Sequence, residues 1–316
     1  GSHNVTLGTF AGKTITTGSE NIFLGCGAGG TSAVTADHNI GLGVEAGRKI
    51  TSGAQNVHIG YKPGAELSDA TGTVYIGQET AEKRQSGNHN IALGTQALYG
   101  DSTPSNNTGT YNFAGGYYAG HAVTSGHSNV IIGKCAAKGA TTAPSNIILG
   151  QGAVSAATFT GSENLVAGFF AGCLLAGGNY NVLLGSVAGR NVAGGSKNFL
   201  GGYAAGDNIT SGSYNVIIGS GVDAASATGD TQLAIGCGAN RWMAGDSSFN
   251  VCFADAAVTI TKSGGILNAT KFCGDGSCLT GISAGFSADD DLNLLSVNTC
   301  SGCSLDGSAG CFNTLL

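Results

Sequence analysis

The chain has 316 residues, of which 56 are glycine, 3 are proline and 10% are charged, with a formal net charge of -6. A helical globule is excluded, because glycine costs a helix about 1 kcal/mol relative to alanine and recurs too often here. The apolar content of 41% is too high for a disordered chain. The 13 basic residues are spread thinly, which argues against nucleic-acid binding, and no apolar run of membrane-spanning length occurs.

From residue 4 onward the chain is built from fourteen repeats spaced by 17 or 18 residues, with one spacing of 22. Twelve repeats begin with Asn, and Gly follows four residues later in all fourteen. An apolar residue follows the first position, and Leu or Ile precedes the Gly in eleven repeats. Representative pairs are Asn21 and Gly25, Asn56 and Gly60, Asn129 and Gly133, and Asn215 and Gly219.

This pattern predicts an all-β fold, a β-solenoid or β-roll in which each repeat forms one rung. We expect one short strand at Asn-Val-x-Leu-Gly, a tight turn, a second short strand at Ala-Gly-x-x-Ile, and a turn back to the next Asn. One rung cannot bury its own apolar residues, so the rungs must stack. Fourteen rungs at the inter-strand spacing give a rod of about 65 Å. The recurring Asn is expected to form a ladder of side-chain amides along the axis.

The strands carry apolar residues on both faces, as at Ile131 between Val130 and Ile132. A strand with one wet face should alternate apolar and polar residues. We therefore expect one face to line the interior and the other to pack on further copies of the chain. Parallel copies around a threefold axis, intertwined or side by side, satisfy this requirement, and the expected partner is the chain itself as a homotrimer.

The repeat Asn-[Val/Ile]-x-[Leu/Ile]-Gly-x-x-Ala-Gly, followed by Thr-Ser-Gly or Thr-Thr-Gly, resembles two related groups over residues 4 to 240. One is the β-roll head of trimeric autotransporter adhesins, and the other is the fibre proteins of tailed phages and large algal viruses. Residues 208 to 219 are similar to the fibre repeats. Residues 272 to 281, Phe-Cys-Gly-Asp-Gly-Ser-Cys-Leu-Thr-Gly, resemble a connector between the shaft modules of such fibres. The resemblance implies a homotrimeric fibre located on the virion that contributes to attachment; a trimeric adhesin head on a bacterial surface is the alternative.

Three regions are expected along the chain. Residues 4–245 form the roll, residues 246–285 a β connector with strands near 251–253 and 258–260, and residues 286–316 an incomplete module. The long spacing between Asn90 and Asn112 places an insertion at residues 99–109, which should bulge between the sixth and seventh rungs.

The cysteines of the roll fall on rungs too far apart for disulfides within one chain, because even the closest pair is separated by roughly 9 to 10 Å. Free thiols are therefore expected at Cys26, Cys135, Cys173 and Cys237. The cluster of Cys300, Cys303 and Cys311 with Cys273 and Cys278 permits a zinc site, but buried or interchain cysteines are the preferred interpretation, and no cofactor or metal is predicted.

No catalytic set of residues emerges, and we expect that the chain is not an enzyme. The histidines occupy different positions of the repeat, and the acidic residues are too sparse for a glycosidase. A left-handed hexapeptide β-helix acyltransferase is a second alternative: Leu7-Gly-Thr-Phe-Ala-Gly12 fits one side of its turn, but the other two sides lack the pattern. An ice-binding solenoid would need a Thr-x-Thr column that most rungs lack.

The expected function is that of a rigid rod that displays loops for host attachment. If a host-surface glycan is bound, exposed aromatic side chains are the candidates, because they stack on sugars. They are Tyr99, Tyr111, Tyr117, Tyr118 and Trp242. A packing or capping role is the alternative for each of them.

Overall fold

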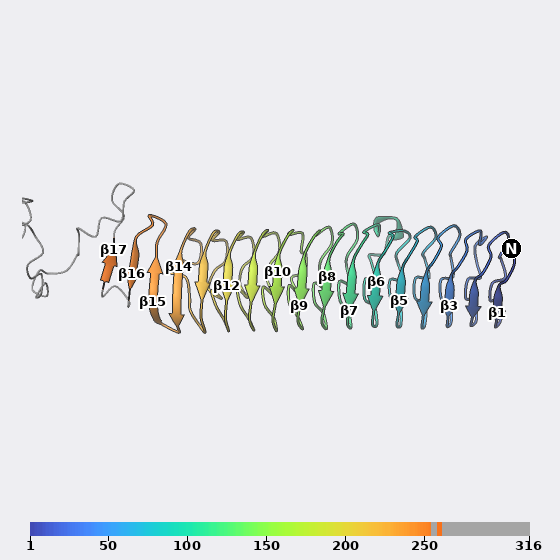
Figure 1. The fold of residues 1–316 in the computed structure, drawn as a ribbon, viewed down its shortest axis with the longest axis horizontal. Helices are drawn as coiled ribbons and strands as arrows, with labels where there is room; N and C mark the ends of the chain where they lie inside the picture. Colours follow the sequence, from blue (N-terminus) through green and yellow to red (C-terminus); the bar gives the residue numbers. More distant parts are fainter. Residues whose placement is uncertain (254–257, 261–316) are drawn as a thin grey trace, which may run out of the picture. The chain divides into compact units, whose positions relative to one another are not determined.

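A computed structural model describes residues 1–253 and 258–260, and the chain divides into the units Gly1–Ala257 and Val258–Leu316. The described part is a β-solenoid of about fourteen rungs, and no α-helix occurs in it (Figure 1). The strands are β1 (Val5–Leu7), β2 (Ile22–Leu24), β3 (Ile40–Leu42), β4 (Val57–Ile59), β5 (Val74–Ile76), β6 (Ile91–Leu93), β7 (Phe113–Gly115), β8 (Val130–Ile132), β9 (Ile147–Leu149), β10 (Leu165–Ala167), β11 (Val182–Leu184), β12 (Phe199–Gly201), β13 (Val216–Ile218), β14 (Leu233–Cys237), β15 (Asn240–Gly245), β16 (Val251–Phe253) and β17 (Val258–Ile260). A single turn of 3-10 helix, η1, spans Pro104–Asn106.

Consecutive strands from β1 to β14 pair in parallel and in register, so that each residue lies beside the residue at the same position of the next repeat. Val130 pairs with Ile147, for example, and Ile132 pairs with Leu149. The parallel stack ends at β14, which pairs in antiparallel fashion with β15, and β15 pairs likewise with β16. The expected connector strands are therefore present as β16 and β17, whereas most of residues 246–285 and all of 286–316 lie outside the described residues.

The prediction of a second strand in each repeat is wrong. After the Gly the chain forms consecutive turns, and outside the named strands the described residues show only the isolated bridges Ile15 to Val34 and Ala140 to Phe159. The cause is backbone conformation, because residues two and four positions after the Gly adopt positive φ, as at Cys135 (57°) and Ala137 (46°). Left-handed residues cannot continue an extended strand.

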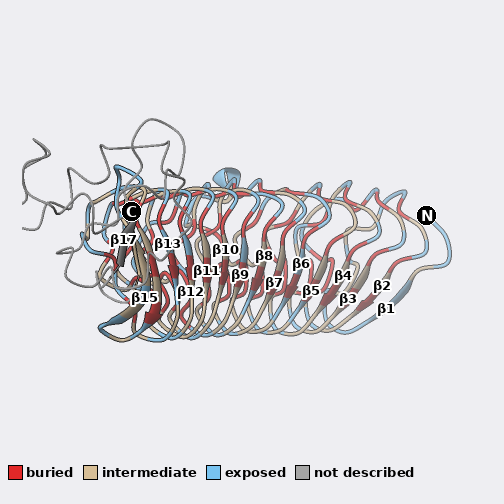
Figure 2. Ribbon diagram, turned by 60° about the vertical axis from the view of Figure 1, so that its left-hand side comes forward, coloured by how far each residue is buried: buried red, intermediate tan, exposed pale blue. Residues whose placement is uncertain are grey.

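In each strand from β2 to β13 the middle residue is buried and faces the interior, and its two neighbours face outward. The buried interior extends along the solenoid (Figure 2). Alanines seven residues after the Asn and aliphatic residues eleven after it complete this interior, as Ala136 and Val123 illustrate. The outward residues are only partly covered, and Ile132 and Ile147 are each 43% exposed.

The Asn ladder is confirmed. Asn129 donates from Nδ2 to Asn112 Oδ1 at 2.9 Å and to Ala143 O at 2.8 Å, and its own Oδ1 accepts two bonds from Asn146. The invariant spacing of the Gly also has a steric cause. At Gly133 φ is +136°, and a Cβ would lie 2.5 Å from the carbonyl oxygen of Gly150 on the next rung.

Candidate functional site

The departures from the repeat concentrate on the fourth to seventh rungs, which begin at Asn56, Thr73, Asn90 and Asn112. In a stacked repeat, the residues that recur serve the stacking, so residues that break the pattern require another explanation. The largest departure is the insertion at residues 99–109, which contains η1 and projects from the rod beside β6 (Figure 1). The prediction of a bulge at this place is confirmed.

Asn107 anchors the insertion to the rung below. Its Nδ2 donates to Lys83 O at 2.9 Å and to Asp101 O at 3.2 Å, and its Oδ1 accepts from the Asp101 backbone at 2.9 Å. Asn107 is buried, whereas the adjacent Asn106 is exposed and bonds only the carboxylate of Asp101 through its side chain. The Asn107 side chain therefore fixes the insertion to the rod at one position.

Arg84 occupies an interior position that other rungs fill with an aliphatic side chain. Its guanidinium is fully buried and donates to Gly109 O at 2.5 Å and to Val123 O at 3.1 Å. These carbonyls lie on the far side of the insertion, so Arg84 spans the interior space that the looped-out residues of the sixth rung leave. Burial lowers the pKa of Arg84, while the neighbouring Tyr75 raises it.

Next to Arg84, the interior column holds two stacked polar rings. The rings of His58 and Tyr75 are 5.1 Å apart and inclined by 5°, and His58 Nε2 lies 3.1 Å from Thr73 Oγ1. Burial lowers the pKa of His58 from 6.5 to about 3, so the imidazole is neutral at physiological pH. His58, Tyr75 and Thr73 are all buried and uncharged, so they form part of the core and have no access to a substrate.

Three of the five predicted aromatic contacts lie together on the outside of the sixth and seventh rungs. Tyr99 and Tyr118 stack on His121 with centroid distances of 5.0 and 4.7 Å, and Tyr117 contacts Tyr118 at 4.2 Å. Burial and the charge of Lys138 lower the pKa of His121. Among these residues, Tyr117 is the most exposed, at 48%.

The two other predicted contacts lie elsewhere. Tyr111 precedes the Asn of the seventh rung and stacks on His89 at 5.2 Å, and it is 62% exposed. Trp242 lies on β15, beyond the last parallel rung, and is 69% exposed. The described structure does not bring either of them to the cluster of Tyr99, Tyr117 and Tyr118.

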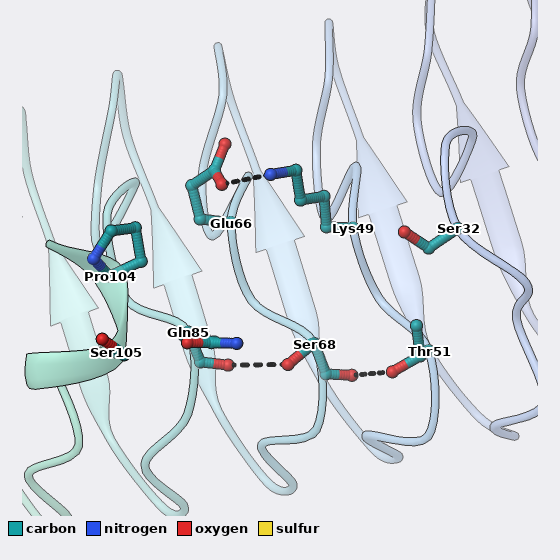
Figure 3. A pocket seen from close by; sticks show the side chains of 8 residues that line it. All are labelled: Ser32, Lys49, Thr51, Glu66, Ser68, Gln85, Pro104 and Ser105. Atoms are coloured by element: carbon teal, nitrogen blue, oxygen red, sulfur yellow. Dashed lines mark hydrogen bonds and ion pairs between the residues drawn. The ribbon is translucent and has the colours of Figure 1, made fainter.

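A polar groove of about 310 Å³ runs along the rungs and ends at the insertion (Figure 3). Its lining combines hydroxyl, amide and charged side chains from successive rungs with the η1 turn: Ser32, Lys49, Thr51, Glu66, Ser68, Gln85, Pro104 and Ser105. Sequence reasoning missed this groove, because its lining residues are spread over more than seventy positions of the chain.

An ion-pair network borders the groove. Glu66 accepts from both Lys49 and Arg48 at 2.5 Å, and Arg48 also lies 3.3 Å from Glu45. Burial alone would raise the pKa of Glu66, but the hydrogen bonds and charges of Lys49 and Arg48 lower it. Glu66 is therefore a carboxylate already neutralised by the protein.

In the described part of the chain, no group of three or more His, Cys, Asp or Glu side chains has the arrangement of a metal site. The cysteines of the roll are free, as expected, at Cys26, Cys135, Cys173 and Cys237. The cysteines considered for zinc, from Cys273 to Cys311, lie outside the described residues. Among the described residues, no helix is long and apolar enough to cross a bilayer.

Comparisons with known proteins leave the chain without an assigned family. No protein-family model, no curated protein and no solved structure matches it.

Arg84 and His58 are the interior residues that sequence reasoning missed. Their signal was available in the repeat alignment, as a charged and a titratable side chain at positions where other rungs carry small or apolar residues.

Proposed function

We propose that the chain is a structural fibre and attachment protein of a virion, which assembles into a homotrimer and displays loops for binding to a host surface. The observation that carries this proposal is the outer face of the sheet. Two parallel columns of apolar residues cover it from β1 to β14, and from β2 to β13 they flank the buried middle position of each strand. Monomeric soluble proteins rarely expose an apolar surface that is continuous over such a length.

The surface of the outer face is also flat. Where the second column has glycine, the first column has phenylalanine, as at Phe113 with Gly115 and Phe199 with Gly201. A methyl group placed on Gly201 would lie 3.4 Å from the Phe199 ring, so the ring covers the site of the missing side chain. A large side chain beside an absent one keeps the volume of the rung similar, which is what close packing against another surface requires.

The apolar columns continue where the solenoid ends. Antiparallel pairing aligns Leu233 with Gly245 and Gly245 with Val251, while Ile235 pairs with Met243 and Met243 with Phe253. The chain thus changes its topology and retains the apolar character of this face. With a length of about 65 Å and a width of about 10 Å, the face has roughly the area that each partner contributes to a stable interface.

The test is the mass of the purified chain in solution. We expect light scattering to give about three times 31.0 kDa. The variant Ile132→Glu places a charge on the outer face, and because this side chain is 43% exposed in one chain, the rung should still fold. It should lower the mass to that of one chain, whereas Ser125→Glu, on an exposed turn away from this face, should leave the assembly intact. A monomeric wild type would overturn the proposal, and a dimeric wild type would overturn the proposed number of three chains.

A further inference from the structure

The groove beside the insertion offers many hydrogen-bonding groups, because seven of its eight lining residues have polar or charged side chains. Thr51 Oγ1 donates to Ser68 O at 2.9 Å, and Ser68 Oγ donates to Gln85 O at 3.2 Å. These bonds use the hydroxyl hydrogens and leave the lone pairs of both oxygens as acceptors. The side chains of Gln85 and Ser105 make no hydrogen bond within the described residues, so they present both donors and acceptors.

The shape of the groove selects an elongated ligand. Thr51, Ser68 and Gln85 occupy the same position on three successive rungs, so their spacing along the axis is about 4.8 Å per rung. Lys49 and Glu66 form the opposite wall, and the η1 turn with Pro104 and Ser105 closes one end (Figure 3). A ligand that fills the groove must therefore extend along the axis and present a polar group at each rung.

The charge of the lining excludes a strongly anionic ligand. Lys49 Nζ lies 2.5 Å from Glu66 Oε2, so the one cation and the one carboxylate that line the groove neutralise each other. Nucleic acids and phosphate groups need cations without such partners. An extended peptide is also disfavoured, because the backbone amides of Thr51 and Ser68 already donate to the next rung and leave no free strand edge.

We propose that this groove binds a linear, uncharged oligosaccharide, whose hydroxyl groups pair with Gln85, Ser105, Thr51 and Ser68 while a ring face packs on Pro104. This inference rests on the proposed attachment function and moves the sugar contact from the exposed tyrosines to the groove. It also gives the insertion a role, since η1 forms the closed end of the site.

The test begins with an array of neutral and acidic oligosaccharides probed with the full chain. We expect the wild type to bind neutral linear members, and calorimetry with the strongest of them then compares variants. Gln85→Ala should weaken binding about tenfold, because it removes hydrogen bonds to the ligand without breaking one in the protein. Ser105→Trp should abolish binding by filling the closed end.

Ser102→Trp is the matched control, because Ser102 is an exposed residue of the same insertion that does not line the groove. It should bind as the wild type does, and circular dichroism should show all three variants to be folded. The inference is overturned if the wild type binds no saccharide or only acidic ones, if Ser105→Trp binds normally, or if Tyr117→Ala removes binding and Gln85→Ala does not. Light scattering of the same samples tests the proposed trimer separately, so either conclusion can fail alone.

Discussion

Removing one member of the Asn ladder should destabilise the rod by an amount that can be derived from its bonds. The side chain of Asn129 takes part in four hydrogen bonds, two donated to Asn112 and Ala143 and two accepted from Asn146. All of them are buried, and each contributes about 1 kcal/mol. Asn129→Ala should therefore lower the free energy of unfolding by about 4 kcal/mol per chain, and it leaves the backbone N–H of Asn146 without its acceptor.

Guanidinium denaturation at one protein concentration measures this loss, and hydrogen exchange reports on it locally. The Asn146 amide should lose protection, whereas amides several rungs away should not. Asn106→Ala is the control, because Asn106 is exposed and its side chain makes one bond, to Asp101. A loss below about 1 kcal/mol for Asn129→Ala, or equal losses for the two variants, would refute the reasoning that the ladder holds the rungs together.

Three further predictions concern single positions. Gly133→Ala should cost about 1 to 3 kcal/mol in denaturation, because its Cβ meets the Gly150 carbonyl at a backbone angle that suits only glycine; a neutral effect would contradict this. Glu163 is exposed with φ of 57°, so Glu163→Gly should stabilise the chain by about 0.5 to 1 kcal/mol while Glu163→Ala does not. Because burial lowers the pKa of His58 from 6.5 to about 3, only the unfolded chain binds this proton between those values, and stability falls as the pH drops below 6.5. From pH 7 to 5 the wild type should lose about 2 kcal/mol more than His58→Phe, and parallel curves would refute the assignment.

The rung spacing and the Asn ladder were predictable, because Asn and Gly recur at the same offset and each has a single physical role there. It was harder to predict which residues of each strand face the interior. In rungs such as Val130-Ile131-Ile132 all three residues are apolar, so alternation gives no signal. Where the middle position holds Gly41 or His58, alternation would place that residue on the outside, yet both are buried. The second strand was wrong because residues such as Cys135 adopt positive φ without being glycine.

The candidate site was predictable in part. The length of one spacing located the insertion, and the aromatic residues near it could be read from the sequence. Their separation could not be read in this way, since Tyr111 and Tyr117 lie only six residues apart, yet Tyr111 stacks on His89 whereas Tyr117 contacts Tyr118. The groove depends on residues from several rungs and from η1, whose proximity follows from stacking and from the anchoring of the insertion by Asn107.

The uniform register of the rungs makes the length of the rod adjustable in whole steps. Each regular rung meets its neighbours through equivalent backbone pairs and the same Asn bond, so deleting residues 129–145 would join two rungs whose surfaces already match. Recombination between repeats of the gene can thus lengthen or shorten the molecule without the need for a new fold. The stretch from Arg84 to Val123 is the exception, because the guanidinium reaches across the insertion and fixes how many rungs lie between. Changes in length should therefore accumulate on either side of this stretch and leave it whole.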